Sequence, residues 1–202
     1  DKTTKKNIIW ATDDYAELGE PYSFKKEILP ELVTGEQDSL IQPRVEKALE
    51  HQTNRTRDKA EVFTPSWICN AQNNLVDEQW FDRKDVFNIQ KEMSWKATTD
   101  KIIFPDDRQH TWQKYVDAQR LEISCGEAPY LVSRYDTVTG ETIPISQRIG
   151  LLDRKLRVIG ENTDTEEEWF TWTKRAFQSV YGFEYQGDSL LLARENLFVT
   201  FV

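Results

Sequence analysis

The sequence has few of the residues that mark membrane, secreted or metal-bound proteins. No apolar run in its 202 residues approaches the ~20 residues that a membrane-spanning helix needs, so we expect no contact with a membrane. The only two cysteines, Cys69 and Cys125, lie far apart and match no metal-binding or redox spacing. The only two histidines, His51 and His110, have no neighbours at ligand spacing, so we expect no metal site. The cysteine usage predicts a reducing compartment, and we expect a cytoplasmic protein.

Positive charge is also scarce. The chain has 26 Lys and Arg against 35 Asp and Glu, a formal net charge of -9. Phosphate contacts need basic side chains on one face, so this balance argues against a broad nucleic-acid-binding surface. Hydrophobic residues make up 38% and aromatic residues 12% of the chain, which excludes a disordered protein. The length favours one domain, or one domain with a large appendage.

Both ends of the sequence suggest that it is a piece of a longer protein. It begins at Asp1, and its only methionine is Met93. It ends in an apolar run, residues 197–202, with no polar tail. We therefore expect further sequence beyond Val202.

The first 110 residues give few structural signals. A strand is predicted at 7–11, and a helix is predicted to begin at Pro43, because proline suits the first helical position. Residues 59–63 are predicted to be extended and to stop at Pro65. Residues 66–110 show no clear hydrophobic period. We interpret 1–110 as a mostly helical extension.

The second half of the chain is more regular. A helix is predicted at 112–119, a short buried strand at 120–124, a turn at 137–140 and a second strand at 179–185. Thr165 and Glu168 have capping-box spacing and predict the start of a helix whose Trp169 and Trp172 face the core. Asp188 is a predicted N-cap for a last helix. Strand, glycine loop, helix, strand and helix in this order are typical of an α/β unit with a parallel sheet.

Two strand ends could form a ligand site. The segment Leu121–Leu131 contains a strand that ends in a turn of small residues, Ser124-Cys125-Gly126. Glu184 lies at the end of the next predicted strand. In open α/β sheets ligands bind at the carboxyl ends of strands, where an acid can accept the hydroxyls of a ribose. An ordinary tight turn and a solvated carboxylate are the simpler interpretations of each feature alone.

A third segment, Phe63-Thr64-Pro65, makes the pattern more specific. With the Glu122–Leu131 loop and Glu184 it resembles, in order and kind, the motifs of adenine-specific DNA methyltransferases, the modification (M) subunits of bacterial restriction–modification systems. The resemblance covers residues 60–68 and 121–202. It implies that residues 111–202 form the first half of a Rossmann-like methyltransferase sheet that binds S-adenosylmethionine. Residues 133–162 are then an insertion that folds over the site.

The resemblance also implies a role for each matching residue. Phe63, Thr64 and Pro65 would line the methionine and carboxylate end of S-adenosylmethionine, and Glu122 would reach its amino group.

In the glycine loop, Cys125, Gly126 and Ala128 would let the backbone approach the cofactor. Glu184 would bind the ribose and Tyr185 would flank the adenine ring. Ala128 stands where the family usually has a second glycine, so the loop is expected to be stiffer than usual.

The catalytic motif of the family is absent. An Asn-Pro-Pro-Tyr-like tetrapeptide, which orients the target amine of a flipped adenine in the family, does not occur in this sequence. We therefore assign no catalytic residue and expect this chain alone to be inactive. DNA would be contacted through regions beyond Val202, and restriction or specificity subunits and a second copy of the chain are further candidate partners.

Two other functions compete with this interpretation. One is a non-catalytic structural module of a restriction complex, and the other is a nucleotide-binding enzyme such as a dehydrogenase. A nuclease is disfavoured, because Ser124 stands where the Pro105-Asp106 and Glu122-Ile123 pattern would need a lysine. Cys125 lacks a motif-linked base and is more simply interpreted as a small packed residue.

Overall fold

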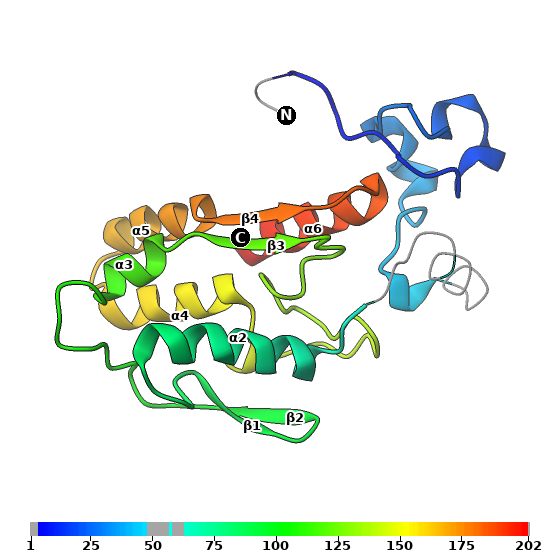
Figure 1. Ribbon diagram of the computed structural model, residues 1–202. Helices are drawn as coiled ribbons and strands as arrows, with labels where there is room; N and C mark the ends of the chain where they lie inside the picture. Colours follow the sequence, from blue (N-terminus) through cyan, green and yellow to red (C-terminus); the bar gives the residue numbers. More distant parts are fainter. Residues whose placement is uncertain (1–3, 48–56, 58–62, 202) are drawn as a thin grey trace. The chain divides into compact units, whose positions relative to one another are not determined.

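The computed structural model describes residues 4–47, 57 and 63–201 (Figure 1). The chain is a mixed α/β protein that divides into two compact units. Unit 1 comprises residues 1–63, 123–127 and 183–202, and unit 2 comprises residues 64–122 and 128–182. The boundary expected near residue 110 therefore lies inside unit 2. Each unit is described by itself below.

The N-terminal part of unit 1 is built from single turns. Five 3-10 helices are described there: η1 (Ala16–Leu18), η2 (Glu20–Tyr22), η3 (Pro30–Leu32), η4 (Gly35–Gln37) and η5 (Arg44–Glu46). Pro43 precedes η5, as its fixed φ favours, and residues 48–49 of the predicted helix lie outside the described residues. Residues 59–62 of the extended segment predicted at 59–63 also lie outside them. The described part of the extension is thus less helical than predicted.

The core of unit 1 forms around Trp10. Its indole is fully buried, lies 4.8 Å from the Tyr15 ring and donates from Nε1 to the carbonyl of Pro21. The strand predicted at 7–11 is only an isolated antiparallel bridge, Ile9 with Glu27. The backbone leaves the extended conformation at Ala11, which has a φ of 52°.

Helix α6 (Gly187–Phe201) completes unit 1. A Cβ at Gly187 would lie 1.9 Å from the carbonyl oxygen of Ile9, so only glycine fits here. The helix begins one residue before Asp188, which is therefore not the N-cap that we predicted. Instead the Asp188 carboxylate is completely buried and accepts from the Tyr15 hydroxyl (2.9 Å) and from the ammonium of Lys47 (3.1 Å).

The first element of unit 2 is helix α2 (Ser66–Phe81), in a region that shows no clear hydrophobic period in the sequence. The helix is followed by the antiparallel hairpin of β1 (Asn88–Lys91) and β2 (Ser94–Ala97), in which Asn88 pairs with Ala97 and Lys91 with Ser94. The buried positions of α2 have helical spacing but are mostly polar: Ser66, Cys69, Asn70, Asn73, Asp77 and Phe81. A search for apolar periodicity therefore misses this helix.

The other elements of unit 2 are α3 (Trp112–Asp117), β3 (Arg120–Ile123), α4 (Leu151–Asn162), α5 (Glu166–Gln178) and β4 (Val180–Phe183), with a 3-10 turn, η6, at Ile145–Gln147. The predicted helices at 112–119 and after Thr165 are confirmed. The Thr165 side chain accepts from the Glu168 N–H as an N-cap. The predicted turn is also present, closed by the bond from Gly140 N–H to the Asp136 carbonyl (2.8 Å). Helix α4, inside the segment that we expected to be an insertion, buries Val158 and Ile159 completely.

Strands β3 and β4 form a two-stranded sheet. The backbone N–H groups of Arg120 and Cys125 donate to the carbonyls of Ser179 and Phe183, so the partner numbers rise together and the strands run parallel. The full Rossmann sheet that the resemblance implies is not present among the described residues.

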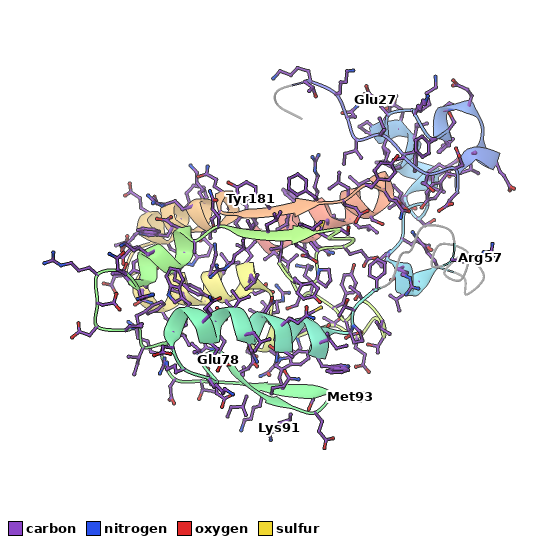
Figure 2. All side chains as sticks on the ribbon, in the orientation of Figure 1. Glu27, Arg57, Glu78, Lys91, Met93 and Tyr181 are labelled. Carbon is purple, nitrogen blue, oxygen red and sulfur yellow. The ribbon has the colours of Figure 1, made fainter. Side chains whose placement is uncertain are left out.

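The prediction that β3 is a buried strand is wrong. Its alternate residues Leu121 and Ile123 are 52% and 73% exposed, and Tyr181 and Phe183 of β4 are also exposed. Figure 2 shows Tyr181 on the outer side of β4. Side chains two apart share a face of a strand, so each strand presents an apolar face that the described residues leave uncovered. Only Glu122 of β3 is buried.

The expected core role of the α5 tryptophans is also not observed. Trp169 is 37% exposed and its neighbour Phe170 is 47% exposed, while Trp172 is half-buried against Trp112. The buried positions of α5 are Thr173 and Ala176. Helical spacing gave the correct element here, but it did not give the buried face.

Candidate functional site

The predicted cofactor loop has an unusual backbone. Ser124, Gly126 and Ala128 all have positive φ, at 53°, 52° and 63°. Left-handed backbone is uncommon outside glycine and concentrates at functional sites. At Ala128, where the resemblance predicts a second glycine, the backbone adopts the conformation that glycine would favour.

Glu184 belongs to unit 1, follows β4 directly and contacts this loop. Its Oε2 accepts the backbone N–H of Gly126 at 2.7 Å, although the two residues are 58 apart in sequence. Its Oε1 accepts the N–H groups of Tyr185 (2.8 Å) and Gln186 (3.0 Å). A carboxylate has about four acceptor positions, so these three bonds leave one, on Oε2. Glu184 can therefore accept one ligand hydroxyl without losing a bond to the loop.

Phe63 lies against the same loop. A Cβ at Gly126 would be 3.3 Å from two carbons of the Phe63 ring, so glycine is favoured here by space as well as by its positive φ. The Arg44 guanidinium lies over the Phe63 ring, 5.2 Å from its centroid. The backbone N–H of Arg44 also donates to the buried carboxylate of Glu127 (2.7 Å). These contacts fix the positions of Phe63 and Arg44 beside the loop.

Two other predicted site residues of unit 1 differ in exposure. Tyr185 is 73% exposed, with its ring 6.3 Å from that of Phe24, so its face can stack on a ligand. Cys125 is buried, which fits a small packed residue at the turn rather than a nucleophile.

The remaining predicted residues belong to unit 2. The Thr64 carbonyl accepts from the Cys69 thiol (3.5 Å) and the Thr137 hydroxyl (3.2 Å), and Pro65 is the N-cap residue of α2. Glu122 is buried. Burial, with the Glu122 charge as the second cause, raises the pKa of the Cys69 thiol to about 12, so Cys69 is an inert thiol at neutral pH.

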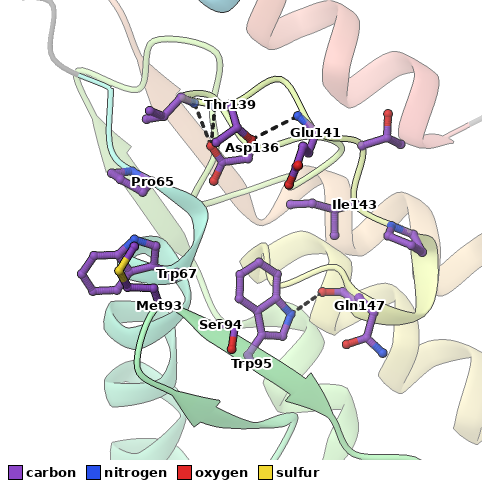
Figure 3. Close-up of a pocket in the computed structure, with 13 residues that line it drawn as sticks. Pro65, Trp67, Met93, Ser94, Trp95, Asp136, Thr139, Glu141, Ile143 and Gln147 are labelled. Carbon is purple, nitrogen blue, oxygen red and sulfur yellow. Dashed lines mark hydrogen bonds between the residues drawn. The ribbon is translucent and has the colours of Figure 1, made fainter.

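A cavity in unit 2 was not anticipated from the sequence. It has a volume of about 500 Å³ and shares Pro65 with the predicted site (Figure 3). Trp67 of α2, Met93, and Trp95 of β2 lie on one side, and Asp136 and Glu141 lie on the other. The Trp95 indole is fixed by its bond to the carbonyl of Gln147 (2.8 Å).

Asp136 is a charged group of this cavity at neutral pH. Burial acts to raise its pKa, but backbone N–H groups from Ser66, Thr139 and Val138 donate to the carboxylate, and the net pKa is below the ordinary value. The distances of these bonds are 2.7, 2.8 and 2.9 Å. Hydrogen bonds to the ionised form favour it, so the cavity carries negative charge.

The buried polar network between α2 and α4 was also not predicted from the sequence. The Arg154 guanidinium is 2% exposed, pairs with Asp77, and donates to Asn70 Oδ1 and Asn74 Oδ1 at 2.9 Å each. The Tyr115 hydroxyl donates to the other oxygen of Asp77 (2.8 Å). Polar residues at the helical positions 70, 73/74 and 77 are the signal that could have revealed this face of α2.

No group of three or more His, Cys, Asp or Glu side chains among the described residues could hold a metal ion. No helix in the described parts of the chain has the length and hydropathy needed to cross a membrane.

Comparisons with protein-family models, with curated proteins and with solved structures gave no match to this chain.

Proposed function

We propose that this chain is the S-adenosylmethionine-binding part of an adenine-specific DNA methyltransferase of a bacterial restriction–modification system. The observation that carries the proposal is the contact between Glu184, Gly126 and Phe63. Residues of three motifs far apart in the sequence meet at one loop: the carboxylate of Glu184 accepts the backbone N–H of Gly126, and the edge of the Phe63 ring lies against the same glycine. In this proposal β3 and β4 belong to a Rossmann-like sheet.

In this proposal the loop residues have the roles that the resemblance implies, and their geometry is compatible with those roles. The remaining acceptor position of Glu184 Oε2 binds one ribose hydroxyl, and the exposed ring of Tyr185 stacks on the adenine. Because the sequence has no Asn-Pro-Pro-Tyr-like tetrapeptide, we expect cofactor binding without methyl transfer. DNA, a restriction or specificity subunit and a second copy of the chain are the proposed partners, in the cytoplasm.

Calorimetric titration with S-adenosylmethionine and S-adenosylhomocysteine tests the proposal. Both should bind the folded protein, and Glu184→Ala should weaken binding by about ten-fold, or about 1.4 kcal/mol. Glu184→Gln keeps one oxygen for the loop and separates lost binding from a collapsed loop. Glu195→Ala, an exposed acid on α6 of the same unit, is the matched control and should bind like the wild type. Absence of binding to well-folded protein contradicts the proposal.

One observation favours a second candidate, a non-catalytic module of a restriction complex. The three backbone bonds of Glu184 would also suit an acid whose role is to hold the loop. For such a module, Glu184→Ala should lower the unfolding temperature while S-adenosylmethionine has no effect on it. Competition with NAD separates both candidates from a dehydrogenase.

A further inference from the structure

The cavity of unit 2 has the dimensions of a small-molecule site. Its volume of about 500 Å³ lies within the roughly 300–1,000 Å³ of ligand pockets. The walls come from α2, the β1–β2 hairpin and the segment before α4.

Aromatic and sulfur-containing side chains supply one side of the cavity. Trp67 and Trp95 offer indole rings, which attract cations through their π faces more strongly than phenyl rings do. Trp95 is held in place, because Gln147 accepts from its Nε1 through the carbonyl and from the Ala97 N–H through Oε1 (3.1 Å). Its ring therefore needs little reordering when a ligand binds, which favours affinity.

The opposite side of the cavity carries negative charge. Asp136 and Glu141 are both acidic, and none of the thirteen lining residues is basic. Asp136 cannot easily swing away, since three backbone N–H groups hold its carboxylate. The net charge of -9 on the whole chain adds to a field that attracts cations and repels anions.

We propose that this cavity binds a small organic cation with an apolar body, of the quaternary ammonium class. Two indoles and an apolar wall suit the methyl groups of such a cation, and the acids suit its charge. A phosphate or carboxylate ligand would meet two carboxylates and no cationic partner. The inference uses residues of unit 2 alone and does not depend on the proposed function.

A pair of probes of the same shape tests the charge. Choline and its neutral isostere 3,3-dimethylbutan-1-ol are titrated separately, with tryptophan fluorescence and calorimetry as readouts. We expect choline to bind at least ten-fold more tightly. Equal affinities, or no binding of choline to the folded protein, overturn the proposal.

Variants locate the binding in this cavity. Glu141→Gln should weaken choline several-fold and leave the neutral isostere unchanged, while Glu166→Gln, an exposed acid on α5, should change neither. Trp67→Leu should weaken choline about ten-fold, and circular dichroism checks that α2 stays folded. If Glu141→Gln and Trp67→Leu both fold and bind choline normally, the site lies elsewhere and the proposal fails. Saturating S-adenosylhomocysteine should not displace choline, and displacement would contradict a site separate from the cofactor.

Discussion

Helices α2 and α5 of unit 2 reverse the usual relation between polarity and burial. Helix α2 buries Asn70, Asn73 and Asp77, whereas α5 leaves Trp169 and Phe170 partly in solvent. This difference in burial follows from the hydrogen-bond partners that the side chains meet. The polar groups of α2 meet donors and acceptors on α4 and on the loop before it, and a satisfied polar group can be buried at small cost. Hydrogen-bond partners rather than hydrophobicity therefore decide which face of α2 is buried.

The largest expected effect comes from removing a charge from this network. Asp77→Ala leaves the guanidinium of Arg154 buried without its ion pair, and we expect a loss of about 3–5 kcal/mol in the free energy of unfolding. Urea denaturation measures this loss. The double variant Asp77→Leu with Arg154→Met should recover much of it, because neither side chain then brings an unpaired charge into the core. A cost below ~1 kcal/mol for Asp77→Ala would show that the network contributes little to stability.

A second test uses Lys155, another buried cation of α4. Burial, with the charge of Arg120 as the second cause, lowers its pKa from 10.5 to about 7, while its ammonium donates to the Ala118 carbonyl and the Ser179 hydroxyl at 2.5 Å. Above pH 7 the folded protein has lost this proton and the unfolded chain still binds it. The free energy of unfolding should therefore rise with pH by up to about 1.4 kcal/mol per unit.

The rise should slow near pH 9 and end between pH 9 and 10. There the Cys69 thiol begins to ionise in the unfolded chain, but it stays protonated in the folded protein because its pKa is raised to about 12. This opposite linkage cancels the effect of Lys155. Above pH 10 stability should fall, because burial also raises the pKa of Tyr115 well above 10. Denaturation from pH 6 to 10.5 measures the profile, and Lys155→Met should lack the rise between pH 7 and 9.

A third test compares one variant in α2 with one in α5, and we expect smaller changes in the free energy of unfolding. Asn73 donates from its amide to the carbonyls of Tyr130 and Ile149, at 3.0 Å each. Asn73→Ala leaves both without this donor and should cost about 2 kcal/mol. Phe170→Ala removes a larger and more apolar side chain from α5, yet should cost about 1 kcal/mol or less, since half of the side chain is already in water. The reverse order in chemical denaturation would show that hydrophobic burial outweighs the polar contacts.

The same contrast explains how much of the structure could be predicted from the sequence. The apolar spacing and the Thr165 cap predicted α5, and the strand–loop–strand pattern predicted the positions of β3 and β4 but not the exposure of β3. The hydrogen bond from Gly126 N–H to Glu184 was found only in the structure. Helix α2 could not be predicted in this way, because its buried stripe is polar. The cavity was also not predicted, since its walls come from three segments that lie far apart in the sequence.

The smallest expected effect compares two left-handed residues of the loop that follows β3, Ser124, which is exposed, and Ala128, which is buried. The strain of positive φ costs a residue other than glycine roughly 1 kcal/mol. Ser124 is exposed, so Ser124→Gly relieves the strain and should stabilise the protein by about 1 kcal/mol. Ala128 is 1% exposed, and its buried methyl group contributes about 0.8 kcal/mol, so the two terms of Ala128→Gly nearly cancel and the unfolding temperature should not move. A clear gain for Ala128→Gly would mean that its methyl group contributes little packing and that the alanine keeps the loop under strain. A clear loss would mean that packing at Ala128 outweighs the strain, so that alanine is the better residue at this position in this loop.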